Sequence, residues 1–62
     1  MALKVEEVAR RLNVSAGMVY REIKQGRLKA IRIGSRMLRV KEEDLADYIR
    51  RQETEVVMME VI

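Results

Sequence analysis

The sequence predicts one mainly α-helical domain with a small β-hairpin, and three observations lead to this fold class. Apolar residues recur at helical spacing in three stretches, the spacing changes to two between the second and third stretch, and turn signals separate them. Sixty-two residues are close to the smallest size at which a hydrophobic core stabilises a domain without disulfides or a bound metal. We therefore expect one unit over residues 1–52 and a separate apolar tail over residues 53–62.

The first helix is predicted over residues 3–12, where positions 5, 8, 9 and 12 are apolar. Acidic residues in its first turn and basic residues in its last turn complement the helix dipole. Lys4 is a poor N-cap. Asn13 tolerates the left-handed conformation, so we expect it to end the helix in a tight turn.

The second helix is predicted between Ser15, a good N-cap, and Gly26, a helix stop. Val19 and Ile23 are four residues apart and are expected to face the core. Gly17 lies in the first turn, where the absence of a side chain permits a close approach of the backbone.

From Leu28 the apolar spacing changes to two, which predicts two short strands ending at Val40. Gly34 and Ser35 supply the turn between them, in the glycine-first manner of a type II′ hairpin. A lone two-stranded hairpin is marginally stable in water, so we expect it to pack against the helices.

A third helix is predicted from an acidic first turn at residues 42–44 to its end near Arg50 and Arg51, with a buried stripe of Leu45, Tyr48 and Ile49. The resulting order of α-turn-α, two-stranded wing and third α-helix is the layout of a winged helix-turn-helix. The expected core is Val5, Val8, Leu12, Val19, Ile23, Leu28, Leu38, Val40, Leu45 and Ile49.

The closing residues 54–62 include six apolar residues, with a spacing that fits neither helix nor strand. Two alternatives stay open for this tail. It folds back over a core too small to close alone, or it mediates self-association or binding to a protein partner.

Composition excludes several functions. The chain has no Cys and no His, which removes disulfides, most zinc sites and the commonest general base. Without a nucleophile–base pair or a glycine-rich phosphate loop, we expect no enzyme activity, no cofactor and no small-molecule ligand. No apolar run is long enough to span a membrane and no signal peptide opens the sequence, so a cytoplasmic protein, nucleoid-associated when bound, is expected.

Charge distribution favours double-stranded DNA as the partner. Residues 1–40 carry ten Lys or Arg against three Glu, whereas residues 41–62 carry three against seven acids. A helix presented by a tight turn can enter the major groove. Candidate phosphate contacts are Tyr20, Arg21 and Lys24 on this helix, and Arg32, Arg36 and Arg39 on the hairpin. Tyr20 has an equal alternative role, half-buried beside the first helix.

The stretches VEEVARRLNVS, VYREIKQGRLKAIRIGSRMLRV and EDLADYI resemble the small helix-turn-helix proteins of the excisionase family, which are related to MerR-type regulators. The resemblance covers residues 3–50 in order and without gaps. It implies that the second helix reads the major groove and the wing contacts the flanking backbone, in DNA recombination or transcription regulation. Carried over by position, the DNA-binding residues are Ala16, Gly17, Met18, Tyr20 and Arg21 on the helix, and Arg32, Ser35 and Arg36 on the wing. We also expect Ser15, at the start of this helix, to bind DNA.

The sequence departs from the family pattern at the start of the second helix. Ala16, Gly17 and Met18 stand where polar residues are usual, and none can form the bidentate hydrogen bonds that distinguish base pairs. Two functions therefore remain: DNA binding mainly through phosphates and shape, or a helix-turn-helix-derived protein-interaction module with degenerate base readout.

Overall fold

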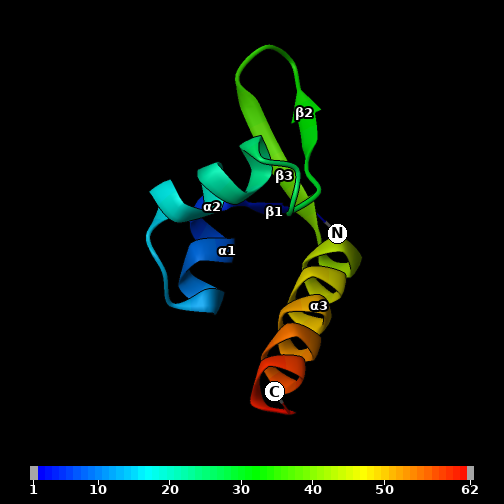
Figure 1. Ribbon diagram of the computed structural model, residues 1–62. Coiled ribbons are helices and arrows are strands. Elements are labelled where there is room, and N and C mark those ends of the chain that lie inside the picture. Colours follow the sequence, from blue (N-terminus) through cyan, green and yellow to red (C-terminus); the bar gives the residue numbers. More distant parts are fainter. Residues whose placement is uncertain (1, 62) are drawn as a thin grey trace.

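A computed structural model of the protein describes residues 2–61, and the side chains of residues 2–53. Its elements, in chain order, are β1 (Ala2–Lys4), α1 (Val5–Leu12), α2 (Ala16–Lys24), β2 (Ile31–Ile33), β3 (Met37–Lys41) and α3 (Glu42–Val61) (Figure 1). The predicted fold class is confirmed: the chain forms a winged helix-turn-helix, with α1 and α2 on one side of the sheet and α3 leading away from it.

The turn between α1 and α2 forms as the sequence predicts. Asn13 takes the left-handed conformation, with φ 57° and ψ 46°, and ends α1. The Ser15 side chain accepts a hydrogen bond at 3.1 Å from the backbone N–H of Met18, which satisfies one of the free donors at the start of α2. Gly26, with φ 79°, follows the last turn of α2 and stops it.

The first residues of the chain form a strand, so the prediction of helix from residue 3 is wrong. β1 pairs antiparallel with β3, with Leu3 opposite Val40. Both side chains are buried, because this pairing places them on the face of the sheet that meets the helices. Lys4 then caps α1 in extended conformation without a side-chain hydrogen bond, as expected from its poor capping ability.

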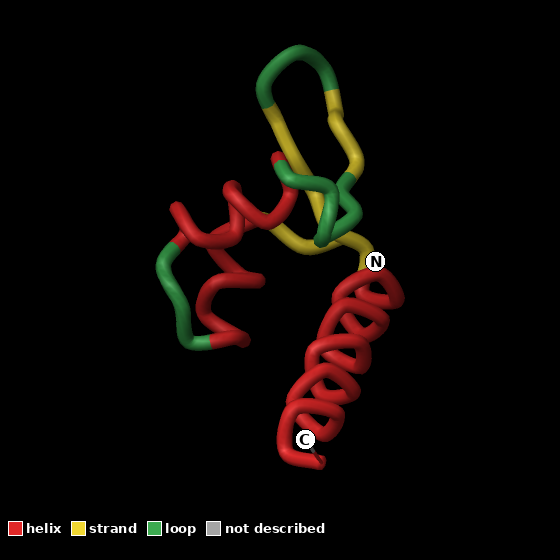
Figure 2. The backbone as a smooth tube through the Cα atoms, viewed as in Figure 1, coloured by secondary structure: helices red, strands yellow, loops and turns green. Residues whose placement is uncertain are grey.

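The hairpin is confirmed, but it is shorter than predicted and its loop is longer. β2 begins at Ile31 rather than at Leu28. Ile33 pairs with Met37, so the loop consists of residues 34–36 and not of a two-residue turn. Gly34 has φ 66°, a conformation that favours glycine. The sheet order is β1-β3-β2, which makes β3 the central strand and leaves the hairpin loop beyond α2 (Figure 2).

The third helix is longer than predicted. It runs to Val61 instead of ending near Arg50 and Arg51, because no helix-breaking residue occurs in that part of the sequence. Leu45 and Tyr48 are buried as expected, whereas Ile49 is 37% exposed and does not belong to the core. The prediction that residues 53–62 pack or self-associate concerns side chains that, apart from Glu53, lie outside the described residues.

The core lies between the sheet, α1, α2 and the first turns of α3. Its buried hydrophobic residues are Leu3, Val5, Val8, Ala9, Val19, Leu28, Val40, Leu45 and Tyr48. Leu12, Ile23 and Leu38, which were predicted as core, are partly buried at its edge. Fewer than a dozen buried side chains within residues 2–53 are consistent with a domain near the lower size limit.

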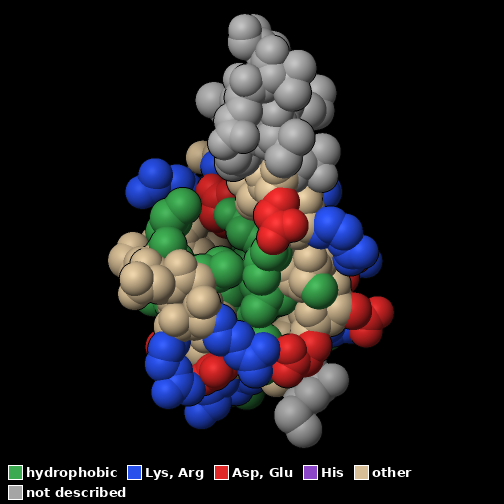
Figure 3. Space-filling model, turned by 90° about the horizontal axis from the view of Figure 1, so that it is seen from below, with side chains coloured by type: hydrophobic (Ala, Val, Ile, Leu, Met, Phe, Trp, Pro, Cys, Tyr) green, Lys and Arg blue, Asp and Glu red, His purple; other side chains and the backbone are tan. Residues whose placement is uncertain are grey.

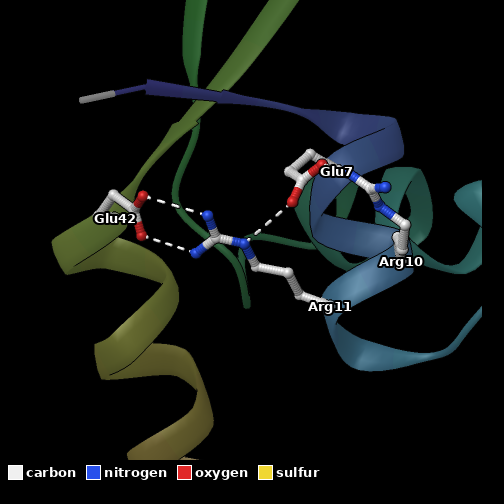
Figure 4. Close-up of polar contacts among 4 residues, drawn as sticks. All are labelled: Glu7, Arg10, Arg11 and Glu42. Atoms are coloured by element: carbon white, nitrogen blue, oxygen red, sulfur yellow. Dashed lines mark hydrogen bonds and ion pairs between the residues drawn. The ribbon is translucent and has the colours of Figure 1, made fainter.

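Arg11 joins α1 to the start of α3 through hydrogen bonds with two carboxylates (Figure 4). Its guanidinium donates to Glu42 at the start of α3, at 2.8 and 3.3 Å, and to Glu7 at 3.2 Å. Glu42 is the main cause that raises the pKa of Arg11, and Glu7 contributes. Hydrogen bonds from Arg10 and then from Arg11 hold the pKa of Glu7 below its ordinary value. All four side chains remain solvent-accessible, so we expect a small net stabilisation.

Candidate nucleic-acid interface

The outer face of α2 carries three exposed residues at helical spacing. Gly17, Arg21 and Lys24 are separated by four and three positions, so they share the face opposite Val19, which is 1% exposed in the core. At Gly17, an added Cβ atom meets only the Ser15 hydroxyl oxygen, at 3.8 Å. This face can therefore approach another molecule closely at its N-terminal end and presents positive charge along its length.

A buried carboxylate on the core side of α2 joins this helix to its neighbours. Glu22 is 8% exposed and accepts hydrogen bonds from the Tyr48 hydroxyl at 2.9 Å and from the Arg27 guanidinium at 3.0 and 2.6 Å. The bonds from Arg27 and then from Tyr48 lower the pKa of Glu22 to about 2, against the cost of burying its charge. Because Tyr48 belongs to α3 and Arg27 to the following loop, Glu22 fixes the orientation of α2 against both.

The loop after α2 is fastened to the same corner. The backbone N–H groups of Arg27 and Leu28 donate to the carbonyl oxygen of Glu22 at 2.9 and 3.1 Å. Arg51 of α3 donates to the carbonyl oxygen of Arg27 at 2.9 Å. The chain between α2 and the wing is thus anchored at its first residues, which limits the movement of the wing relative to α2.

Tyr20 lies on the flank of α2 that faces the wing. Its side chain is 46% exposed and lines a small polar niche of about 270 Å³. The other walls come from the start of α1 and from one edge of β3, namely Lys4, Val5, Glu6, Arg36, Met37, Leu38 and Arg39. The two roles predicted for Tyr20 are therefore compatible, because the ring lies beside α1 and remains accessible.

The three predicted wing arginines occupy different parts of the hairpin. Arg32 donates to the carbonyl oxygen of Ser35 at 3.4 Å, which folds it over the loop. Arg36 is exposed within the loop. Arg39 donates to the carbonyl oxygen of Leu38 at 2.9 Å and lies 3.7 Å from the Met37 sulfur, so it is held along β3.

Ala16 and Met18, which are also predicted to bind DNA, lie on other sides of α2 than Gly17, Arg21 and Lys24. Ala16 packs against the core. Met18 is 41% exposed and lines a mainly apolar cavity of about 250 Å³ on the flank of α2 nearest α3. Leu12, Val14, Val19, Glu22, Leu28, Tyr48 and Gln52 complete the cavity. Figure 3 shows the molecule from below, and on this face hydrophobic side chains reach the surface.

The structure thus brings Tyr20 and Arg36 to one niche and places Gly17, Arg21 and Lys24 on one face. The sequence analysis considered Lys4 only as the N-cap of the first helix and missed it as a cation beside Tyr20, because that proximity depends on the tertiary arrangement. Glu22 was also missed. It lies three residues after the buried Val19, a helical spacing that indicates an inward-facing side chain. A carboxylate on the apolar side of an amphipathic helix was the available signal.

Within the described part of the chain, no group of acidic side chains is arranged to hold a metal ion. No described helix is both long and apolar enough to cross a membrane.

The comparisons with known proteins agree with this arrangement. A family model described as a helix-turn-helix domain matches residues 2–53, which is most of the chain and includes every residue of the candidate interface. No match was found among curated proteins or among solved structures.

Proposed function

Because the chain belongs to the helix-turn-helix domain family, whose fold binds DNA, we propose that it is a small excisionase-type or transcription-regulating protein that lays α2 in the major groove. The wing then contacts the flanking backbone or the adjacent minor groove. One observation carries this proposal. The outward basic face of α2 stands beside a wing with no acidic residue between Lys24 and Lys41.

The roles of individual residues follow from their positions. Arg21 and Lys24 face outward on α2 and are suited to phosphate contacts beside the groove. Tyr20 and Arg36 line one niche and are suited to a common phosphate. Gly17 allows the backbone of α2 to approach the base edges but supplies no hydrogen bond, so phosphate charge and DNA shape supply most of the binding free energy.

A salt titration tests the proposal. Binding to a mixed-sequence duplex is followed by fluorescence anisotropy at several salt concentrations. With about four phosphates contacted, the plot of log affinity against log salt has a slope near −4. The Arg32→Glu/Arg36→Glu variant is expected to lose binding, and no binding of the wild type at low salt rules the function out.

A charge-matched pair of variants localises the contact. Arg36→Gln and Arg50→Gln each remove one positive charge from an exposed side chain, but Arg50 lies on α3 and pairs with Asp47. Arg36→Gln is expected to reduce the magnitude of the salt slope by about 1, and Arg50→Gln to leave the slope unchanged. Equal effects of the two variants indicate attraction by net charge without a defined site.

The second candidate function is binding to another protein. Its support is the position of Met18, which lines an apolar cavity with Tyr48 and Gln52 instead of joining the basic face. An apolar contact of this kind responds weakly to salt, so the same titration separates the two functions. Self-association through residues 53–62 is part of this candidate and is tested by the sedimentation of a chain ending at residue 53.

A further inference from the structure

The end of the wing exposes a pair of apolar side chains. Ile33 and Met37 are cross-strand partners, the last pair before the loop, and they are 44% and 49% exposed. They lie on the face of the sheet opposite Leu3 and Val40, since Met37 is three positions from Val40 on β3 and Ile33 is the cross-strand partner of Met37. Met37 also lines the niche beside Tyr20, but both side chains remain accessible to solvent.

Arginine side chains surround the apolar pair. Arg39 extends along β3 until its guanidinium lies 3.7 Å from the Met37 sulfur. Arg32 and Arg36 flank the loop. An apolar tip flanked by cations, in a stretch with no acidic residue between Lys24 and Lys41, is complementary to a surface whose walls are anionic and whose floor is apolar. The DNA minor groove, with phosphates along its edges and sugars and stacked bases between them, has this chemistry.

We propose that the wing inserts Ile33 and Met37 into the minor groove, where they part a base step and bend the duplex. This inference rests on the proposed DNA binding and adds a mechanism of selectivity to it. The B-form minor groove is about 6 Å wide, whereas two paired strands are about 4.8 Å apart before their side chains are counted. The wing tip therefore enters only if the groove widens, which bends the DNA toward the major groove.

This mechanism supplies the selectivity that α2 lacks. Ala16 is packed against the core, Gly17 has no side chain and Met18 lines a cavity, so the first turn of α2 offers no hydrogen bonds from side chains to the bases. An inserted wedge instead favours steps that unstack easily, such as TA and CA/TG. The protein then selects deformable sequences rather than a particular set of base edges.

The test measures bending and unstacking together with binding. The probe is a duplex of about 20 base pairs, about 68 Å long, with a donor and an acceptor dye at its ends and 2-aminopurine beside a central TA step. For the wild type we expect higher energy transfer and brighter 2-aminopurine fluorescence on binding, as for a kink of about 20–90°. Anisotropy of the same duplex reports binding independently.

The decisive variant is Ile33→Thr/Met37→Thr, because threonine keeps the β-propensity of the hairpin while removing most of the apolar surface. We expect it to bind with an unchanged salt slope and to lose both the energy-transfer and the 2-aminopurine signals. Ile31→Thr is the matched control, since Ile31 lies on the same face at the far end of β2, and it should retain both signals. If circular dichroism shows the double variant unfolded, Met37→Gln alone replaces it.

The outcomes separate the two proposals. If the wild type binds without bending or unstacking the DNA, the proposed insertion of Ile33 and Met37 is wrong. The same holds if the double variant bends DNA as the wild type does. In both cases the proposal of DNA binding is retained. If the wild type does not bind DNA at all, both proposals fail. If it binds phosphatidylserine vesicles through Ile33 and Met37 while DNA bending is unaffected by their loss, the apolar tip serves a membrane surface and the wedge is overturned.

Discussion

The hydroxyl of Tyr48 donates a hydrogen bond of 2.9 Å to the carboxylate of Glu22, and this bond ties α3 to the inner side of α2. Glu22 is the one charged residue among the buried side chains that the structure describes. A buried carboxylate is stabilising only when its partners are in place, so the orientation of α2 depends on residues that lie far from its outer face.

Replacing Tyr48 with Phe is expected to lower the free energy of unfolding by about 1.5–3 kcal/mol, because it removes a hydrogen bond to a buried charge. Urea denaturation at neutral pH measures the change. Tyr20→Phe is the control: Tyr20 is 46% exposed, so loss of its hydroxyl should leave stability nearly unchanged. Equal stability of the two variants would mean that the bond to Glu22 contributes little.

The stability of the wild type should fall as the pH is lowered from about 4.5 to about 2. The folded state lowers the pKa of Glu22 from 4.5 to about 2, so the unfolded state binds the proton more tightly over this range and is favoured by acid. Glu7, whose pKa is also lowered, contributes in the same direction. In Glu22→Gln the fall should be shallower and the stability at neutral pH lower. Denaturation curves at several pH values that are parallel for the two proteins contradict this assignment.

The same substitution at two glycines should have opposite effects. Gly17→Ala is expected to raise stability by up to about 1 kcal/mol, because the added Cβ makes only an ordinary contact of 3.8 Å with the Ser15 hydroxyl oxygen and alanine favours a helix. Gly26→Ala should lower stability by about 1 kcal/mol, since Gly26 has φ 79°, which alanine adopts reluctantly. Thermal denaturation of the two variants gives the signs, and a shift of both in the same direction is inconsistent with these backbone conformations.

Leu3 should matter more for stability than Ile49. Leu3 is 8% exposed and packs in the core, so Leu3→Ala is expected to cost about 2 kcal/mol or more. Ile49 is 37% exposed, so Ile49→Ala should cost less than about 1 kcal/mol. Chemical denaturation ranks the two, and the reverse order would support a helix beginning at residue 3 with Ile49 in the core.

The features that the sequence predicted are those determined by neighbouring residues. Ser15 caps α2, Asn13 and Gly26 end helices in the left-handed region, and the alternating residues of the hairpin form two strands. Each depends on the conformational preferences of one to four consecutive residues. For this reason the order of the helices and the wing could be predicted before the structure was known.

The features that the sequence did not predict depend on partners distant in the chain. Leu3 fits both a helix and a strand, and its pairing with Val40 decides between them. Ile49 continues a helical stripe, but α3 leads away from the core, so that Tyr48 is the last buried residue of α3 within residues 42–53. In the candidate interface, the outward positions of Arg21 and Lys24 followed from helical spacing, whereas the niche shared by Tyr20, Lys4 and Arg36 requires the tertiary arrangement.

The pairing of β1 with β3 also has a consequence for folding kinetics. The wing closes over a loop of three residues, whereas Leu3 reaches Val40 only after both intervening helices have formed or collapsed. Closure of the longer loop costs more chain entropy, so the hairpin is expected to form early and β1 to dock late. In amide hydrogen exchange, the N–H groups that join β1 to β3 should therefore exchange before those that join β2 to β3.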